Sequence, residues 1–244
     1  MSSKRYLFSC VSYDSLLYAI GGKNDTYLNT VETYDPKTNI WKSIESMNIE
    51  RNEHDATVIQ NTLYVCGGSN EIYILNSCEY YSQNTNKWSM TTPMNSKRRG
   101  LALVAHNGYM YAIGGNNGIE VFNTMERFDT TTKQWQPMAN MSYTRGYFGS
   151  TIFMDKIYVC GGYNSSNEKT CETYDPLTNQ WTQIASMLSD RDNFQLITFN
   201  QQLYAMGGVF GKPDTVEIYD YKSNQWSYSQ SLPIHAYDFG ATVI

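Results

Sequence analysis

Few side chains in this sequence are placed to do catalytic or metal chemistry. Its three histidines, His54, His106 and His235, share no regular spacing with one another or with cysteine and carboxylate residues. Zinc sites bring cysteine and histidine ligands together at short, recognisable spacings, and none of those spacings occurs. The sequence also lacks the G-x-S-x-G, phosphate-binding and H-E-x-x-H motifs. We therefore expect no catalytic residue, no metal site and no cofactor.

Arginine is the functional side chain that does recur at a fixed spacing. It stands four residues after a methionine in five places, Arg5, Arg51, Arg98, Arg145 and Arg191, and Ala236 breaks the series. A guanidinium group can hold a carboxylate of a partner in two-point fashion. It can equally donate hydrogen bonds to loop carbonyls of its own protein. The sequence leaves both alternatives open.

The arginines belong to a repeat that runs through nearly the whole chain. Five glycine pairs begin at Gly21, Gly67, Gly114, Gly161 and Gly207, at steps of 46 or 47 residues. A tyrosine precedes each pair by three residues, and a tryptophan follows it by 18 to 20 residues. A glutamate and an aromatic residue, such as Glu32 and Tyr34, lie between them two residues apart. Self-similarity at such a period predicts a repeat architecture.

Each repeat has the pattern of short β-strands joined by tight turns. LYVCGG and IYVCGG are β-rich runs that end at the paired glycines, and VETYD and WKSI are extended segments joined by DPKTN. In that joint, Pro36 presets φ for a turn and Asn39 tolerates a left-handed conformation. Four short strands in about 47 residues, repeated, predict an all-β propeller whose blades bury their faces against each other.

The double glycine, the E-x-Y-D phrase and the spaced tryptophan resemble the kelch repeat over practically the whole chain. The sequence is similar above all to the kelch domains of BTB-kelch proteins. In that family the propeller binds a target protein, and a separate BTB module recruits a cullin-3 ubiquitin ligase. The resemblance therefore implies a non-enzymatic protein-interaction module. Because this sequence contains no BTB module, we expect cullin-3 as a partner only if such a module exists elsewhere in the full-length protein.

The repeats predict one kelch propeller domain over residues 1–244. Their approximate bounds are 1–46, 47–93, 94–140, 141–186 and 187–231, with a partial unit at 232–244. This arrangement gives five four-stranded blades and one extra strand. Propellers of the resembling kind usually have six blades, so we expect a fragment of a six-bladed ring, with closure as a five-bladed ring as the alternative. Residues 6–12 and 237–244 offer the same first strand, and we expect that they cannot both occupy one place.

Composition and charge disfavour nucleic acids and membranes as partners. The net charge is −5, so binding to a phosphate backbone has little electrostatic support. The longest apolar runs are about five residues, far short of the roughly 20 that cross a bilayer. Five cysteines, an odd number, suit a reducing compartment, and we expect a cytoplasmic protein. Positions that other repeats fill with aliphatic residues are held by Cys66, Cys78, Cys160 and Cys171, which indicates core packing.

Partner contacts are expected where the repeats differ, because residues shared by every repeat serve the scaffold. The resemblance implies a binding end built from the loops after the glycine pairs and from the linkers that carry the arginines. The expected partner-binding residues are Lys23, Arg51, Glu53, Arg98, Arg99, Asn116, Arg145, Tyr147, Tyr163, Arg191 and Asn193. Together with Lys97, the arginines would make this end locally basic and suited to a carboxylate-bearing peptide.

Three functions are compared against the sequence. The leading hypothesis is the substrate-recognition half of a cullin-3 ubiquitin-ligase adaptor, or a relative without a BTB module that binds its partner without recruiting the ligase. The second is a cytoskeletal scaffold that binds actin. The third is an enzyme on a kelch-like propeller, which is disfavoured because no Tyr/His/Cys constellation for a copper oxidase can be assembled.

Overall fold

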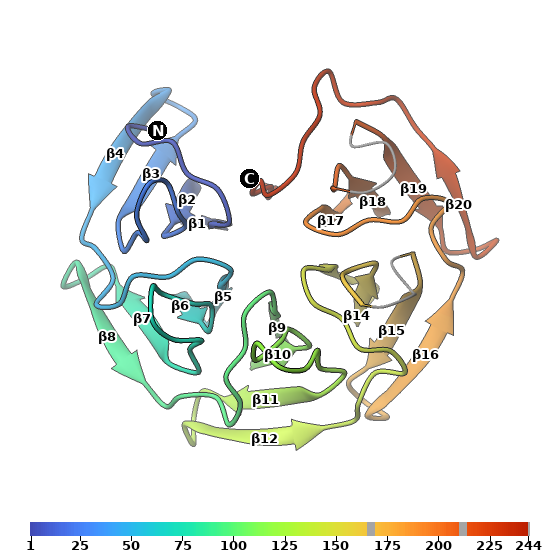
Figure 1. Cartoon of the computed structure of the whole chain (residues 1–244), viewed down its shortest axis with the longest axis horizontal. Coiled ribbons are helices and arrows are strands. Elements are labelled where there is room, and N and C mark those ends of the chain that lie inside the picture. Colours follow the sequence, from blue (N-terminus) through green and yellow to red (C-terminus); the bar gives the residue numbers. More distant parts are fainter. Residues whose placement is uncertain (165–168, 210–213, 244) are drawn as a thin grey trace.

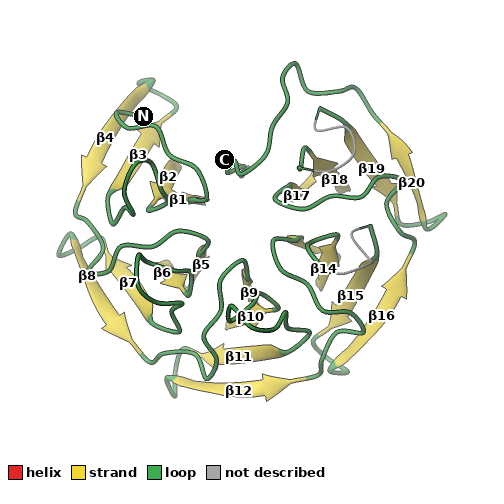
Figure 2. Ribbon diagram, in the orientation of Figure 1, coloured by secondary structure: helices red, strands yellow, loops and turns green. Residues whose placement is uncertain are grey.

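The computed structural model describes residues 1–164, 169–209 and 214–243, and all regular secondary structure in these residues is β-strand. Five antiparallel sheets of four strands each surround a central axis, so the chain forms a β-propeller with five blades (Figure 1, Figure 2). In each blade the strands follow one another in sequence order, and the first lies nearest the axis (Figure 1). The all-β propeller fold predicted from the repeat is confirmed.

The strands are short, and nearly all of them have five residues. Blade 1 consists of β1 Ser9–Tyr13, β2 Leu16–Ile20, β3 Val31–Asp35 and β4 Ile40–Ile44. Blade 2 consists of β5 Asp55–Ile59, β6 Thr62–Cys66, β7 Cys78–Ser82 and β8 Lys87–Thr91. Blade 3 consists of β9 Ala102–His106, β10 Tyr109–Ile113, β11 Met125–Asp129 and β12 Gln134–Met138. Blade 4 consists of β13 Gly149–Phe153, β14 Lys156–Cys160, β15 Cys171–Asp175 and β16 Gln180–Ile184. Blade 5 consists of β17 Gln195–Phe199, β18 Gln202–Met206, β19 Val216–Asp220 and β20 Gln225–Tyr228.

The turns inside each blade follow from a few residues that accept a left-handed backbone. The turn between the first two strands has positive φ at both central residues, as at Asp14 (51°) and Ser15 (60°), which matches the twist of a tight hairpin. The turn between the last two strands places Asn39 at φ 57°, as expected from the sequence. The carboxylate of Asp35 accepts a hydrogen bond from the amide of Lys37 at 2.8 Å and fixes the start of that turn.

Aromatic side chains fill the spaces between neighbouring blades. Four buried apolar clusters each combine residues of two adjacent blades. In each of them a tyrosine of one blade meets an aromatic ring of the next, with ring centroids 6.0–6.4 Å apart: Tyr18–Tyr81, Tyr64–Phe128, Tyr111–Tyr174 and Tyr158–Tyr219. The repeated aromatic residues of the sequence therefore stabilise the packing of neighbouring blades against each other.

The end of the chain differs from the expectation of an extra strand. Residues 237–243 are assigned no strand, and Ile244 lies outside the described residues. After β20 the chain returns to the axis and lies between β1 and β17, in the gap that separates blades 1 and 5 (Figure 1). The two copies of the first-strand sequence occupy neighbouring positions around the axis, with residues 6–12 in blade 1. They do not compete for one place.

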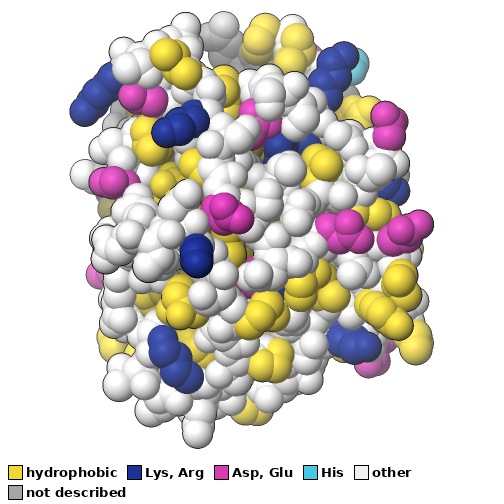
Figure 3. Space-filling model, turned by 90° about the vertical axis from the view of Figure 1, so that its left-hand side faces the viewer, with side chains coloured by type: hydrophobic (Ala, Val, Ile, Leu, Met, Phe, Trp, Pro, Cys, Tyr) yellow, Lys and Arg dark blue, Asp and Glu magenta, His cyan; other side chains and the backbone are white. Residues whose placement is uncertain are grey.

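The outer wall of the propeller carries both signs of charge interspersed with apolar side chains, as Figure 3 shows for one side of the molecule. The part of the chain that the structure describes contains no helix long and apolar enough to span a membrane.

Candidate protein-binding face

The two faces of the propeller are built from different segments. One face, called the loop face here, carries the loop between the second and third strand of each blade and the linkers between blades. Its described segments are residues 1–8, 21–30, 45–54, 67–77, 92–101, 114–124, 139–148, 161–164, 169–170, 185–194, 207–209, 214–215 and 229–240. The opposite turn face carries only the short turns inside the blades. The longer and more variable segments, which the sequence predicted to hold the partner, therefore share one face.

The recurring arginine joins each linker to the blade that follows it. Arg51 donates to the carbonyl oxygens of Gly67 and Ser77, both at 2.9 Å, and its Nη2 lies 3.0 Å from Glu79 Oε1. The same glutamate accepts the backbone amide of Asn48 at 2.7 Å, so it holds the linker as well as the arginine. Equivalent ion pairs, with N–O distances of 2.8–3.1 Å, are Arg5–Glu32, Arg98–Glu126, Arg145–Glu172 and Arg191–Glu217.

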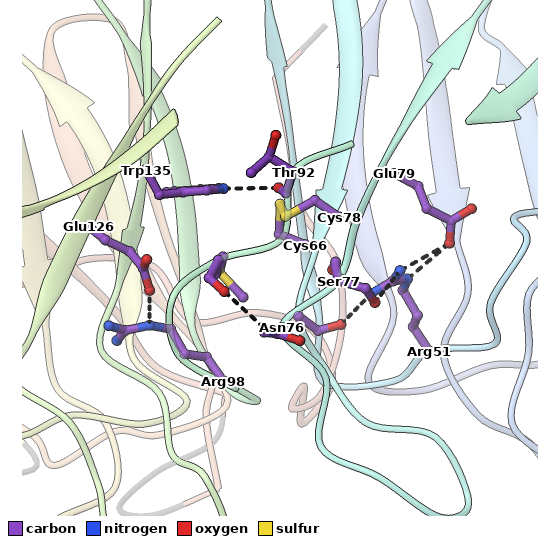
Figure 4. The surroundings of a disulfide bond; sticks show 12 residues. Arg51, Cys66, Asn76, Ser77, Cys78, Glu79, Thr92, Arg98, Glu126 and Trp135 are labelled. Carbon is purple, nitrogen blue, oxygen red and sulfur yellow. Dashed lines mark hydrogen bonds and ion pairs between the residues drawn. A yellow bond between two sulfur atoms is a disulfide. The ribbon is translucent and has the colours of Figure 1, made fainter. Parts of the chain in front are cut away.

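These ion pairs correct the expected role of four arginines. Arg51, Arg145 and Arg191 are fully buried, and Arg98 is 2% exposed, so none of them can reach a partner on the surface. Their guanidinium groups donate to carbonyl and carboxylate oxygens of the scaffold, which was the second of the two alternatives that the sequence left open. Figure 4 shows Arg51 with Glu79 and Arg98 with Glu126 on either side of the sulfur atoms of Cys66 and Cys78.

In the first anchor, the surroundings of Glu32 favour its charged state. Burial raises the pKa of Glu32, but hydrogen bonds from Ser2 and Ser3 and the charge of Arg5 outweigh it and hold the pKa at about 2. Burial lowers the pKa of Arg51, and the adjacent charge of Glu79 opposes that shift. An anchor of this kind is an internal charge pair that is compensated within the fold.

The four cysteines that the sequence assigned to core packing are buried, and they are also joined in two disulfides. Cys66 and Cys78 form a disulfide across β6 and β7, and Cys160 and Cys171 form one across β14 and β15, with Cα atoms 4.2 Å apart in each (Figure 4 shows the first). The strand register brings each pair opposite one another, so burial and cross-linking occur together. Cys10 is the free cysteine. The argument from cysteine count for a reducing compartment therefore fails, and a cytoplasmic location stays a prediction.

Around the axis, six linker residues form a closed circuit of backbone hydrogen bonds. Each has positive φ, between 49° and 59°, and each amide donates to the carbonyl of the previous member. Going round the circuit, the members are Leu7, Glu53, Gly100, Tyr147, Asn193 and Asp238. Asp238 occupies the sixth position, donating to Asn193 at 3.2 Å, and Leu7 donates to Asp238 at 3.4 Å. The segment after blade 5 thus completes a six-membered circuit above five blades.

This circuit forms the mouth of a central cavity of about 470 Å³ lined by the innermost strand of each blade. The cavity wall includes Asp55, whose carboxylate accepts the amide of Leu103 in the next blade at 2.8 Å. In the described residues, no group of three or more His, Cys, Asp or Glu side chains is placed to hold a metal ion. The arrangement offers a recess for part of a partner and hydrogen-bonding groups around its rim.

Four of the expected binding residues meet in one polar network at the mouth. Tyr147 donates its hydroxyl to Glu53 Oε1 at 3.0 Å, although the two residues are 94 positions apart. Glu53 Oε2 lies 3.5 Å from Arg99 Nη1, and Arg99 Nε donates to Asn116 Oδ1 at 3.0 Å. Burial, followed by the charge of Glu53, raises the pKa of Tyr147 to about 12, so this hydroxyl remains a donor. Ser69, which was not among the predicted residues, donates to Glu53 Oε2 at 3.1 Å.

The remaining expected residues also lie on the loop face. Asn193 is a member of the circuit, and Tyr163 is 54% exposed. Lys23 pairs through its backbone with Tyr6, and its Nζ lies 4.6 Å from the centre of the Tyr27 ring. The structure brings each of these loop residues beside a linker residue, because the positions after the arginine and after the glycine pair bridge each other.

The sequence did not single out several exposed apolar residues of the same face. Ile119 is 95% exposed, Ile72 73% and Tyr73 61%, all three in loops after glycine pairs. Tyr6 and Tyr237 are exposed directly before the circuit members Leu7 and Asp238. Their signal was present in the variable loops, where large apolar residues stand among Asn, Gly and Ser. Such side chains are typical of protein-binding surfaces.

Comparison with known proteins finds the same repeat throughout the chain. The kelch motif matches residues 4–48, 50–95, 97–142, 144–188 and 190–233. Human Kelch-like protein 33 is 42% identical over 69 residues, which are 28% of this chain and 13% of that protein. Kelch-like ECH-associated protein 1A of Danio rerio is 36% identical over 75 residues, 29% of this chain and 12% of that protein. F-box/kelch-repeat protein SKIP4 of Arabidopsis thaliana is 36% identical over 70 residues, 28% of this chain and 20% of that protein.

The chain therefore spans a small part of the length of these relatives. Among solved structures, that of YjhT is similar with a TM-score of 0.79 and 16% identity, covering 93% of this chain and 84% of that one. At this identity the likeness concerns the fold alone.

Proposed function

The chain belongs to the family of proteins built from kelch motifs, and from this premise we propose that its loop face holds a target protein for a ubiquitin ligase. At the coarser level the chain is a protein-interaction propeller domain. The finer role, recognition of a substrate for cullin-3-dependent ubiquitylation, rests on the kelch-like relatives and needs a BTB module in the full-length protein. The relatives match over short segments, so their activities come to this chain as a proposal.

One observation carries the proposal. The loop face exposes large apolar side chains on loops that differ from blade to blade, above a scaffold whose charged groups are paired internally. Paired arginines hold the linkers in place without facing solvent, and the loops are free to vary without loss of the ring. Function on such a scaffold is expected in its variable loops.

The proposal is tested with a matched pair of surface variants. Ile119 on the loop face is 95% exposed and Leu177 in a β15–β16 turn of the opposite face is 92% exposed, so replacing either by serine removes a similar apolar surface. Wild-type protein and both variants are used to capture partners, which are quantified by mass spectrometry. We expect Ile119→Ser to lose the specific partner and Leu177→Ser to keep it.

The ligase role is then measured on the captured partner. Its half-life in cells should lengthen, and its ubiquitylation should fall, when the gene encoding the propeller is deleted. A partner lost with Ile119→Ser whose turnover is unchanged would leave a protein-binding module and remove the ligase role. Actin remains the alternative prediction, and co-sedimentation with filaments that depends on the loop face would favour it.

A further inference from the structure

The charge of the loop face differs from the basic end that the sequence predicted. The five anchoring arginines are neutralised by Glu32, Glu79, Glu126, Glu172 and Glu217. Outside these anchors, the described loop-face segments contain five cationic side chains: Lys4, Lys23, Lys97, Arg99 and Lys169. The same segments contain ten carboxylates: Asp25, Glu45, Glu50, Glu53, Glu71, Glu120, Asp190, Asp192, Asp214 and Asp238. The surface that faces a partner is therefore acidic.

Negative charge is concentrated where the circuit passes its sixth position. Glu53 and Asp238 stand on either side of Leu7 in the circuit of hydrogen bonds. Burial, then Asp192 and then Glu53, raise the pKa of Asp238 to about 6, which places three carboxylates within electrostatic reach of one another. Arg99 is the cation beside Glu53, and its side chain is 37% exposed and also bound to Asn116.

Exposed tyrosines border the same part of the rim. Tyr6 is 43% exposed and Tyr237 is 58% exposed, and they precede Leu7 and Asp238, which are hydrogen-bonded to each other. The face of a tyrosine ring attracts the ammonium group of lysine and the guanidinium group of arginine. Carboxylates form their strongest hydrogen bonds with the same two groups. Exposed aromatic rings beside a group of carboxylates favour a cationic ligand.

We propose that the loop face docks a partner segment that carries lysine or arginine, with a cationic side chain at the rim between Tyr6, Tyr237, Asp238 and Glu53. This inference rests on the proposed function, since it names the chemistry of the partner held by that face. The apolar residues Ile119 and Ile72 on the neighbouring loops receive apolar side chains of the same segment. An acidic segment would meet more carboxylates than cationic side chains on the described part of this face.

Charge complementarity also predicts the kinetics of binding. Opposite charges on the two partners speed association, and salt screens them. Affinity for a cationic segment should therefore fall as the salt concentration rises, mainly through a slower association rate. Affinity for a segment held by apolar contacts alone would change little over the same range.

The test is selection of peptides from a random 12-residue library displayed on phage, using the folded wild-type chain as bait. We expect the enriched peptides to contain more Lys and Arg than Asp and Glu. The most enriched peptide is then synthesised, and its Kd is measured by fluorescence anisotropy for wild type and two variants. Asp238→Asn combined with Glu53→Gln should weaken binding about tenfold or more, the range of a lost charge pair.

The control for this double variant is Asp155→Asn. Asp155 has φ 57° and Asp238 has φ 53°, so both accept asparagine equally well, but Asp155 is exposed in the β13–β14 turn of the opposite face. This control should leave the Kd unchanged. Thermal unfolding of the double variant and of the control verifies that a change in binding does not come from loss of the fold.

The outcomes separate the two proposals. Enrichment of acidic or uncharged peptides whose binding ignores Asp238 and Glu53 would overturn the cationic partner and leave the protein-binding function intact. Failure to enrich any peptide, together with capture experiments in which Ile119→Ser loses no partner, would count against the loop face as a binding surface altogether.

Discussion

The linker at residues 45–54 and the segment at 229–240 both bind the glycine pair of the preceding blade, but they differ in their side-chain contacts. In the first, the carbonyl of Arg51 accepts the amide of Gly22 in the blade before, at 2.7 Å, while the side chain of Arg51 binds Glu79 in the blade after. In the second, Ala236 stands at the arginine position, and its carbonyl accepts the amide of Gly208 at 2.9 Å. The backbone contact is kept, and the side-chain anchor is absent.

A junction between blades therefore has two separable parts: a backbone contact to the preceding blade and a side-chain anchor to the following blade. The backbone half depends on the glycine pair of the preceding blade: a Cβ at Gly21 would lie 2.6 Å from the carbonyl oxygen of Arg51, and one at Gly207 would lie 2.3 Å from that of Ala236. Only glycine allows that approach. The side-chain half is the ion pair between the linker arginine and a glutamate of the next blade. Each of the five described blades has such a pair.

The largest expected effect comes from removing an arginine anchor. Arg98→Ala leaves Glu126 buried without its partner and deprives the carbonyls of Gly114 and Thr124 of their donor, so the free energy of unfolding should fall by about 3–5 kcal/mol. Urea denaturation measures this change. The neighbouring Arg99→Ala, whose ion pair is partly exposed, should cost under about 1 kcal/mol. Equal losses in the two variants would show that the buried pair does not hold the junction.

Tryptophans that lie between two blades should contribute more to stability than the tryptophan beside the gap. Trp135 is 9% exposed and donates its Nε1 to the carbonyl of Thr92 in the linker before it, at 3.1 Å. Trp41, in blade 1 beside the gap, is half-buried. Trp135→Ala should therefore cost about 3–5 kcal/mol, and Trp41→Ala roughly 1–2 kcal/mol.

Chemical denaturation of both tryptophan variants provides the measurement. Binding of a partner should weaken only as far as each variant unfolds. A loss for Trp41→Ala as large as that for Trp135→Ala would mean that blade 1 is packed on both sides.

A smaller effect, the dependence of stability on pH, is expected from the one junction that contains a buried histidine. His54 takes the position that the other junctions fill with Phe8, Leu101, Phe148, Phe194 and Phe239. Burial, followed by the charge of Arg51, lowers the pKa of His54 to about 3. The unfolded chain, with a histidine pKa near 6.5, binds a proton below that pH that the folded chain does not, so stability falls as the pH falls from 6.5 toward 3.

His54→Phe should remove this contribution. Between pH 7 and pH 5 the variant should lose about 2 kcal/mol less stability than wild type. Urea denaturation at the two pH values measures the difference. If both proteins lose stability equally over that range, His54 is not buried as a neutral side chain.

The sequence predicted the repeating parts of the fold better than their electrostatics. Glycine pairs, turn asparagines and spaced aromatics each impose a local conformation or a packing contact, so their period predicts blades. The role of the arginines could not be decided from spacing alone. A signal did exist, because each arginine is followed 26 to 28 residues later by the glutamate that binds it.

The disulfides could be predicted only with the register of the strands, and the acidic loop face only with knowledge of which charges pair with each other. Cysteines occur in both positions of repeats two and four and in neither position of the other repeats, which is the pattern of a cross-strand pair. The acidic net charge of the loop face becomes clear only once the five arginines are known to form ion pairs inside the scaffold. Ile119 corresponds to Ile72 in the second repeat but to Thr26 in the first, so the period does not predict an exposed apolar residue at this position.

The smallest effect is expected where the circuit closes at its sixth position. The amides of Glu53, Gly100, Tyr147 and Asn193 donate within the circuit at 2.8–3.0 Å, whereas those of Asp238 and Leu7 donate at 3.2 and 3.4 Å. Asp238 also lies in a segment where Ala236 stands at the position of the anchoring arginine. Local opening should therefore expose the amides of Leu7 and Asp238 more often than the other four, and hydrogen exchange measured by NMR should be at least about tenfold faster for these two. Equal protection of all six amides would contradict the weaker sixth junction, and it would show that the glycine pair of blade 5 and the backbone circuit suffice to hold a linker without its arginine.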